Sequence, residues 1–218
     1  MDHPRCILAC PNEIRDWARY RFNGRLFVCS GNHDWWSNDE ITDTDANGGW
    51  LRKLTRDGVT CDNDGAPIGN VHFFCHAYAA RAQLPTVEGK QWILLHHEPP
   101  SRCAAALTGD SSADLGSSHL REQISAAANP PILVLSGHVH RPKSWRGEIG
   151  HSIVLNPTYD EEASFPNHLR IDLSNGFVTW ISERRGEWSL KILPQTGKAD
   201  ARREDTPTLS TDNSTDIS

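Results

Sequence analysis

The stretch LFVCSGNHD, residues 26–34, joins a short apolar run to a loop of glycine, asparagine, histidine and aspartate. The continuous apolar run 26–29 predicts a strand that is buried on both of its faces. Loops at the carboxyl ends of such strands carry the functional side chains of α/β proteins. We therefore expect an α/β fold with polar site residues directly after this strand.

Two further loops that contain histidine also follow apolar runs. HEPP, residues 97–100, follows the run 91–95, and GHVH, residues 137–140, follows the run 132–135. Glycine lets the backbone turn sharply, and proline stiffens the exit from a strand. An asparagine carbonyl together with imidazole nitrogens suits manganese, iron, zinc or nickel. The three loops together therefore predict a divalent transition-metal site of unspecified metal.

The rest of the chain alternates strands and helices and then ends in strands alone. Helical spacing of apolar residues predicts helices at 11–21 and 117–128, the second with Leu120, Ile124 and Ala127 facing inward. Strands are predicted at 71–78, 91–95, 132–135, 152–155, 169–173, 177–181 and 188–192.

The strands of the last third predict an antiparallel sheet that closes the domain. Asn175-Gly176 can supply the two positive φ values of a tight hairpin turn between two of them. Two sheets must pack their apolar faces together while helices cover the outer faces. We therefore expect a layered sandwich in the order helix, sheet, sheet, helix.

The length and composition predict one domain and a polar tail. With 218 residues and 37% hydrophobic content, the chain can bury one sizeable core, which we assign to residues 1–194. Residues 195–218 are rich in Thr, Ser, Asp, Lys and Arg and have almost no large apolar side chains. Such a segment does not offset its ordering entropy, so a disordered tail is expected.

The charge pattern and the cysteines restrict the compartment and the partners. A formal net charge of −6 with evenly mixed signs provides no basic stripe, which argues against a nucleic-acid binder. No apolar stretch approaches the roughly 20 residues of a membrane span, and no signal-peptide pattern opens the chain. We therefore expect a cytoplasmic protein that acts on small substrates, with its 6 cysteines reduced.

The ordered motifs resemble those of the calcineurin-like metallophosphoesterases, whose signature is DxH, GDxxD, GNH(D/E), a later H and GHxH. GNHD, the histidine of HEPP and GHVH stand in that order in this chain. The segments 134–141 (VLSGHVHR), 156–157 (NP) and 166–173 (PNHLRIDL) also resemble the C-terminal half of bacterial members. The resemblance covers roughly residues 12–182 and implies a layered αββα sandwich of the metallophosphoesterase type.

The resemblance also implies roles for individual residues of the three loops. Asn32, His97 and His138 would bind one metal ion, and His140 would bind a second. From the residues alone, two histidines two positions apart share a face in extended backbone, although a turn could aim them at two different ions. The neighbouring His96 is expected to be structural.

The implied activity is hydrolysis of a phosphate mono- or diester by a metal-activated hydroxide. His33 would contact the scissile phosphate and protonate the leaving oxygen, with Asp34 orienting its ring. Arg141 follows the last motif and could bind a substrate phosphate oxygen through its fork of donors, although a solvated ion-pairing role is an equal alternative.

The chain departs from the family signature before GNHD. Only 30 residues precede Gly31, and they contain neither DxH nor GDxxD. We therefore expect an N-terminally truncated sandwich that lacks the first strand-helix-strand unit and leaves an edge of the strand at 25–30, or of a neighbouring strand, unpaired. An oligomer or a complementing N-terminal segment could then complete the site. The alternatives are an inactive remnant that serves as a binding or regulatory module, or a reading frame that starts late.

Overall fold

The structure is a computed structural model that describes residues 25–32, 59–78 and 83–192. The helix expected at 11–21 and the tail expected at 195–218 lie outside these residues. No helix in the described part of the chain is both long enough and apolar enough to cross a membrane.

A six-stranded mixed sheet forms the centre of the fold, in the order β3-β4-β5-β6-β8-β7. The four inner strands run parallel, and the edge strands β3 and β7 are antiparallel to their neighbours. The four inner strands confirm predicted strands, whereas the more polar edge strands were missed. The strands are β3 (Asp64–Ile68), β4 (Val71–His76), β5 (Gln91–His96), β6 (Leu133–Leu135), β7 (Arg146–Ile149) and β8 (Ser152–Leu155).

A three-stranded antiparallel sheet follows in the sequence, in the order β11-β10-β9, and confirms the sheet expected from the last third of the chain except for the strand at 152–155, which is β8 and pairs in parallel with β6 in the central sheet. Its strands are β9 (His168–Asp172), β10 (Phe177–Ser182) and β11 (Gly186–Lys191). The expected tight turn at Asn175-Gly176 is wrong in detail. Asp172 pairs with Phe177, so four residues connect the strands, and only Gly176 of the two has a positive φ, of 70°.

The helix α3 (Ser118–Ala126) confirms the predicted helix with slightly shorter bounds. Ser117 caps it, because the Ser117 side chain accepts a hydrogen bond from the Leu120 backbone N–H. Leu120 and Ile124 are buried as expected. Ala127 is the C-cap residue and is only partly buried.

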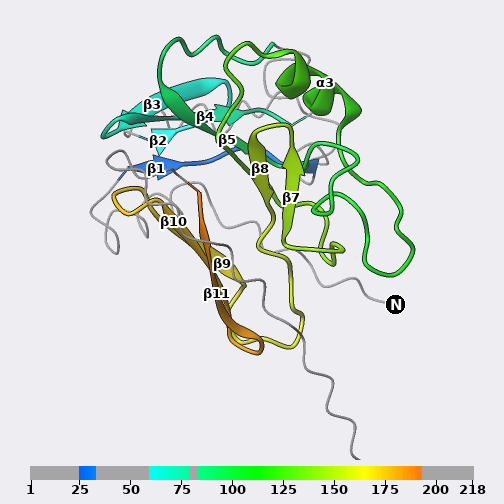
Figure 1. The fold of residues 1–218 in the computed structure, drawn as a ribbon. Coiled ribbons are helices and arrows are strands. Elements are labelled where there is room, and N and C mark those ends of the chain that lie inside the picture. Colours follow the sequence, from blue (N-terminus) through cyan, green and yellow to red (C-terminus); the bar gives the residue numbers. More distant parts are fainter. Residues whose placement is uncertain (1–24, 33–58, 79–82, 193–218) are drawn as a thin grey trace, which may run out of the picture.

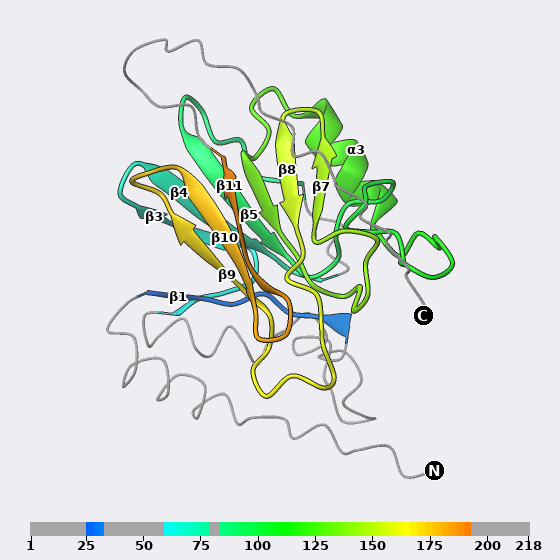
Figure 2. The same cartoon turned by 60° about the horizontal axis from the view of Figure 1, so that its bottom comes forward.

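Two apolar clusters, one on each face of the six-stranded sheet, define three layers (Figure 1, Figure 2). Leu94, Val134 and Val154 pack beneath α3, whereas the alternate residues of the same strands pack against the three-stranded sheet. The described residues therefore form a helix layer, a mixed sheet and a second sheet. The alternate residues are Ile93, Leu133 and Leu155, which meet Val178, Leu169 and Ile171.

The strand of the opening stretch is shorter and less buried than predicted. β1 (Leu26–Phe27) is only partly buried, so the expected burial on both faces is wrong. It pairs in parallel with β2 (Val59–Thr60), a strand that the sequence did not reveal. β1 thus has a partner along one edge, and none of the other described strands pairs along its second edge. The Phe27 ring lies 5.2 Å from that of Phe73, so β1 covers the same face of the central sheet as the three-stranded sheet does.

Candidate metal centre

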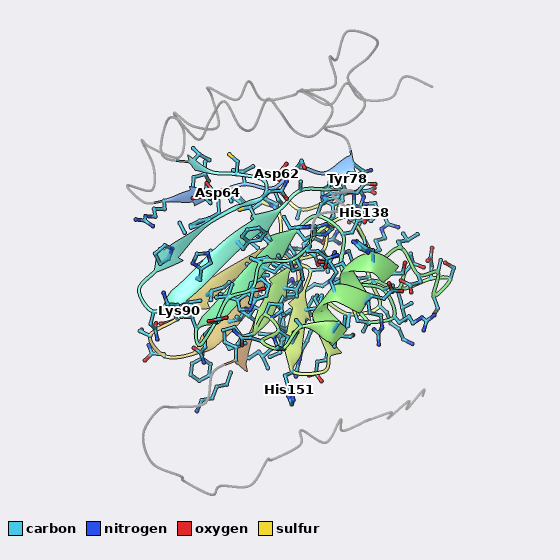
Figure 3. The ribbon with its side chains drawn as sticks, turned by 90° about the horizontal axis from the view of Figure 1, so that it is seen from above. Asp62, Asp64, Tyr78, Lys90, His138 and His151 are labelled. Carbon is cyan, nitrogen blue, oxygen red and sulfur yellow. The ribbon has the colours of Figure 1, made fainter. Side chains whose placement is uncertain are left out.

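The candidate site lies at the carboxyl end of the central parallel strands. Tyr78 follows β4, His97 follows β5 and His138 follows β6. In Figure 3, Tyr78 and His138 lie together at one end of the sheet, and Lys90 and His151 lie at the opposite end. Parallel pairing of β4, β5 and β6 brings loops that are distant in sequence to one edge.

Three of the expected metal ligands are in contact. His97 Nε2 lies 2.7 Å from Asn32 Oδ1, and His138 Nδ1 lies 3.2 Å from His97 Nε2. The imidazole rings of the two histidines meet edge to face with 5.1 Å between their centroids. Residues from two other loops thus each place a potential ligand atom against His97 Nε2.

The distances around His97 Nε2 can be compared with those expected for ligands of one shared cation. One ring nitrogen carries at most one proton, so it cannot donate to an amide oxygen and to a second imidazole nitrogen at full strength. Two ligand atoms that each lie about 2.1 Å from one ion are separated by about 3.0 Å at a right angle and about 3.4 Å at a tetrahedral angle. The separation between His138 and His97 falls in that range, and the separation between Asn32 and His97 is slightly shorter.

Backbone geometry makes this convergence possible. A Cβ atom added at Gly31 would lie 2.8 Å from His97 Nδ1, so only glycine lets the ring approach the loop so closely. His138 has a φ of 62°, a left-handed conformation that non-glycine residues seldom adopt. Non-glycine residues with such backbone angles persist only where the surrounding structure holds them, and they are most common at functional sites.

The loop that carries Asn32 is held by residues that the sequence analysis did not single out. The Ser30 backbone N–H donates to Asp62 Oδ1 over 2.8 Å, and Asp62 is buried. The Tyr78 backbone N–H donates to Ser30 Oγ over 3.0 Å, and the Tyr78 ring stands edge-on to His97. Asp62 follows the two-residue strand β2, which is too short to give a periodic signal in the sequence.

Ionisable groups around His97 have shifted pKa values. Burial lowers the pKa of His96 to about 4, so the ring is neutral and its Nδ1–H donates to the Glu98 carbonyl. This agrees with the structural role expected for His96. Burial also raises the pKa of the Glu98 carboxyl. The pKa of Tyr78 is raised by burial and then by the charge of Glu98.

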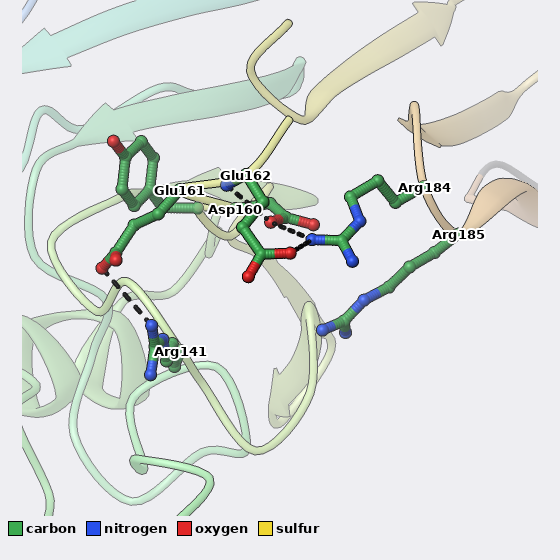
Figure 4. A pocket seen from close by; sticks show the side chains of 7 residues that line it. Arg141, Asp160, Glu161, Glu162, Arg184 and Arg185 are labelled. Carbon is green, nitrogen blue, oxygen red and sulfur yellow. Dashed lines mark hydrogen bonds and ion pairs between the residues drawn. The ribbon is translucent and has the colours of Figure 1, made fainter. Parts of the chain in front are cut away.

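His140 and Arg141 follow His138 in the chain and belong to a second feature. His140 is exposed, with its ring 5.4 Å from that of Tyr159, and its carbonyl accepts a hydrogen bond from the Tyr159 N–H. Tyr159 also lines an open pocket of about 520 Å³ (Figure 4). The other residues that line it are Arg141, Asp160, Glu161, Glu162, Arg184 and Arg185.

The pocket carries equal numbers of guanidinium and carboxylate groups. Arg141 pairs with Glu161 over 3.3 Å, with both side chains largely exposed. Arg184 pairs with Glu162 and, over 3.4 Å, with Asp160. Arg184 and the carboxylates were not predicted from the sequence, because neither an arginine after a strand nor an acidic loop is a distinctive signal.

Two of the expected site residues are not described by the structure, and the described residues do not form a complete metal site. His33 and Asp34, the expected proton donor and its orienting partner, lie outside the described residues. Among the residues that the structure describes, no group of three or more His, Cys, Asp or Glu side chains is arranged to hold a metal. The contacting group consists of two histidines and one asparagine, and no described contact joins His140 to it.

Comparison with known proteins adds little to this geometry. No family model matches the chain, and no curated protein matches it. A solved crystal structure is similar at a TM-score of 0.41 and 11% sequence identity. The match covers 66% of this chain and 61% of the other, so the chain spans less than two thirds of that structure. A likeness this weak carries no argument about fold or function.

Proposed function

We propose that the chain is a metal-dependent phosphoesterase of the calcineurin-like type, which hydrolyses a phosphate mono- or diester beside Asn32, His97 and His138. The observation that carries the proposal is the convergence of these side chains, because His97 Nε2 lies 2.7 Å from the amide oxygen and 3.2 Å from the second imidazole. In this proposal, the helix and two sheets are part of a layered αββα sandwich.

The ligand set suits a divalent transition metal such as manganese, iron, zinc or nickel. Such an ion, when bound, polarises a phosphoryl oxygen and lowers the pKa of water. His33 is proposed to protonate the leaving oxygen and Asp34 to orient the His33 ring. His140 is proposed to serve a second ion once the missing ligands are supplied, so the chain alone holds one ion.

Arg141 is proposed to bind the substrate at the rim of the site. Its ion pair with Glu161 is exposed, and exposed pairs contribute only about 0–1 kcal/mol. The guanidinium can therefore turn from Glu161 to a phosphate oxygen at little cost. The pocket beside it contains equal numbers of positive and negative groups, which favours a small phosphoester over a polyanion such as nucleic acid.

A specific observation favours a second candidate function, that of a metal-binding or regulatory module without catalysis. No carboxylate joins the contacting group in the described part of the chain, and a two-ion centre needs a bridging ligand to hold ions about 3.5–4 Å apart. A second copy of the chain or a complementing segment with the DxH and GDxxD motifs is proposed to supply it for an active enzyme.

Metal content tests the site directly. We expect the purified chain, after incubation with manganese or zinc and dialysis, to retain at most one ion per molecule by elemental analysis. Asn32→Ala and His138→Ala should each weaken binding by more than about 100-fold, beyond the 10–100-fold loss that is typical of outer partners. His151→Ala is the matched control, because this exposed histidine lies at the opposite end of the sheet (Figure 3).

Hydrolysis of an aryl phosphate monoester and an aryl phosphate diester separates the two functions. Slow, metal-dependent turnover that disappears in Asn32→Ala and His33→Ala, but persists in His151→Ala, would support the phosphoesterase. Stoichiometric metal binding with turnover no faster than a mock purification would support the non-catalytic module. Two tightly held ions per chain would contradict the single-ion site, and equal binding by all variants would exclude the proposed ligands.

A further inference from the structure

The turn with the left-handed backbone at His138 is closed by a hydrogen bond from the Val139 N–H to the Gly137 carbonyl over 2.7 Å, and the side chain of Asn156, directly after β8, holds it as well. Asn156 Nδ2 donates to the Gly137 carbonyl and to the Val139 carbonyl, each over 2.9 Å. Gly137 and Val139 are the residues on either side of His138, whose φ is 62°. The Gly137 carbonyl belongs to the peptide unit that precedes His138, and the Val139 carbonyl to the unit after Val139, so one amide group holds the loop before and after His138.

Strand pairing explains why Asn156 can reach this loop. β6 and β8 run parallel with Leu135 opposite Leu155, so the residues directly after them leave the sheet side by side. Asn156 is only 1% exposed, and both of its Nδ2 protons are used. Its Oδ1 accepts a hydrogen bond from the Thr158 N–H over 2.9 Å, which turns the same side chain toward the next loop.

That next loop leads to the second sheet and to the pocket. Thr158 also has a left-handed backbone, with a φ of 68°, and its Oγ1 accepts a hydrogen bond from Asn167 Nδ2 over 2.6 Å. The adjacent Pro157 carbonyl accepts a hydrogen bond from Trp180 Nε1 in β10. Tyr159, one residue further, lies against His140. The Asn156 side chain thus joins the His138 turn to the loop that borders the pocket.

We propose that Asn156 is a positioning residue: its amide holds the His138 turn in the left-handed conformation that directs the imidazole to His97 and Asn32. It touches neither metal nor substrate in this role. Its effect on metal affinity rests on the proposed function, whereas its effect on the His138 ring does not. A donor is required, because an aspartate of the same shape would place a carboxylate against two buried carbonyl oxygens.

The experiment compares Asn156→Asp with Asn129→Asp in the full chain. Asn129 is a matched control, since its Nδ2 also donates to two carbonyls, those of Val87 and Lys90, far from the site. Asn156→Ser is a second variant in case Asn156→Asp does not fold. Serine has a single hydroxyl donor on a shorter side chain and adds no charge. Histidine ring ¹⁵N shifts of the metal-free protein report the His138 and His97 contact. Zinc titration and the absorption bands of bound cobalt report the site itself.

We expect Asn156→Asp and Asn156→Ser to shift the His138 ring resonances, lower zinc affinity about 10–100-fold and alter the cobalt bands. Asn129→Asp should do none of these, even where it lowers the melting temperature by a similar amount. Unchanged His138 resonances in the folded Asn156 variants would overturn the proposal. If the unmodified chain binds no metal, the proposed function fails, and the metal-free ring shifts still decide the role of Asn156.

Discussion

Gly31 sets how closely the His97 ring can approach the Asn32 loop. The Cβ atom of an alanine would lie 2.8 Å from His97 Nδ1 and 2.9 Å from Cε1, which forces the ring to move. We expect Gly31→Ala to weaken metal binding by about 10–100-fold, as displaced ligand geometry does. Calorimetric titration with zinc measures the change.

Gly137→Ala is the control for that substitution. Gly137 lies in a loop of the same site, but a Cβ there would meet nothing within 4 Å, and its φ is not positive. Its affinity should match that of the unmodified chain. Equal losses in both variants would show that the loops tolerate no added methyl group, whereas no loss in either would show that the His97 ring has room to move.

Cys61 provides a residue-scale prediction that is independent of the metal. Burial, followed by the charges of Asp62 and Asp64, raises the pKa of its thiol to about 11. At pH 8 the thiolate fraction would be about 0.1%, against about a quarter for an ordinary cysteine of pKa ~8.5. Alkylation of the native chain, followed by peptide mass spectrometry, should find Cys61 modified at least about 100-fold more slowly than after denaturation. Similar rates in both states would contradict its burial.

Among the structural elements, the connection between β9 and β10 depends on Asp172. Its Oδ1 accepts hydrogen bonds from the Ser174 hydroxyl over 2.6 Å and from the Asn175 N–H over 3.1 Å. The side chains of Ser174 and then Asn175 lower the pKa of the carboxyl to about 2. Because the folded pKa is lower than the ordinary ~3.9, the stabilisation is complete above pH ~4 and is lost as the pH falls toward 2.

The test is a carbon-detected titration of the Asp172 carboxyl together with stability measurements between pH 2 and 5. Asp172→Asn should reduce the loss of stability between pH 5 and pH 2. Asp64→Asn, which changes an exposed residue of β3, should not reduce this loss. A measured pKa near 4 for Asp172 would contradict the hydrogen-bonded turn.

The elements that were missed share a physical cause. β3 contains glycine and proline, and β7 contains arginine, glycine and glutamate, so neither shows an apolar period. Both are edge strands that pair on one side, where polar residues are tolerated. The inner strands were predicted because burial on both faces requires the continuous apolar runs that the sequence displays. The turn at Asn175 was misjudged because Asp172 caps a longer loop.

For the whole molecule, alternate residues of the central strands join all three layers. Leu133 is fully buried in the cluster against the three-stranded sheet, and its neighbour Val134 is fully buried in the cluster beneath α3. Leu133→Ala should lower the free energy of unfolding by about 2–5 kcal/mol. Because one strand serves both faces, amide hydrogen exchange should accelerate in α3 and β10 alike.

Ile68→Ala is the matched surface control, since Ile68 is 39% exposed at the end of an edge strand. Its effect should stay within about 0.5 kcal/mol. Faster exchange in β10 but not in α3 of Leu133→Ala would show that the second sheet unfolds independently of the helix layer.

The sequence alone determined the inner strands, the helix, and the position at strand ends of the three loops that carry Asn32, His97 and His138. Burial makes this possible, because it requires apolar residues at regular local spacing. The resemblance of its motifs to those of the calcineurin-like metallophosphoesterases also implied that Asn32, His97 and His138 belong together. The tertiary structure alone decided their contact distances, the left-handed turn at His138 and the hydrogen bonds of Asn156 that span it. These depend on the register of β5, β6 and β8, which joins residues far apart in the chain and leaves no local pattern in the sequence.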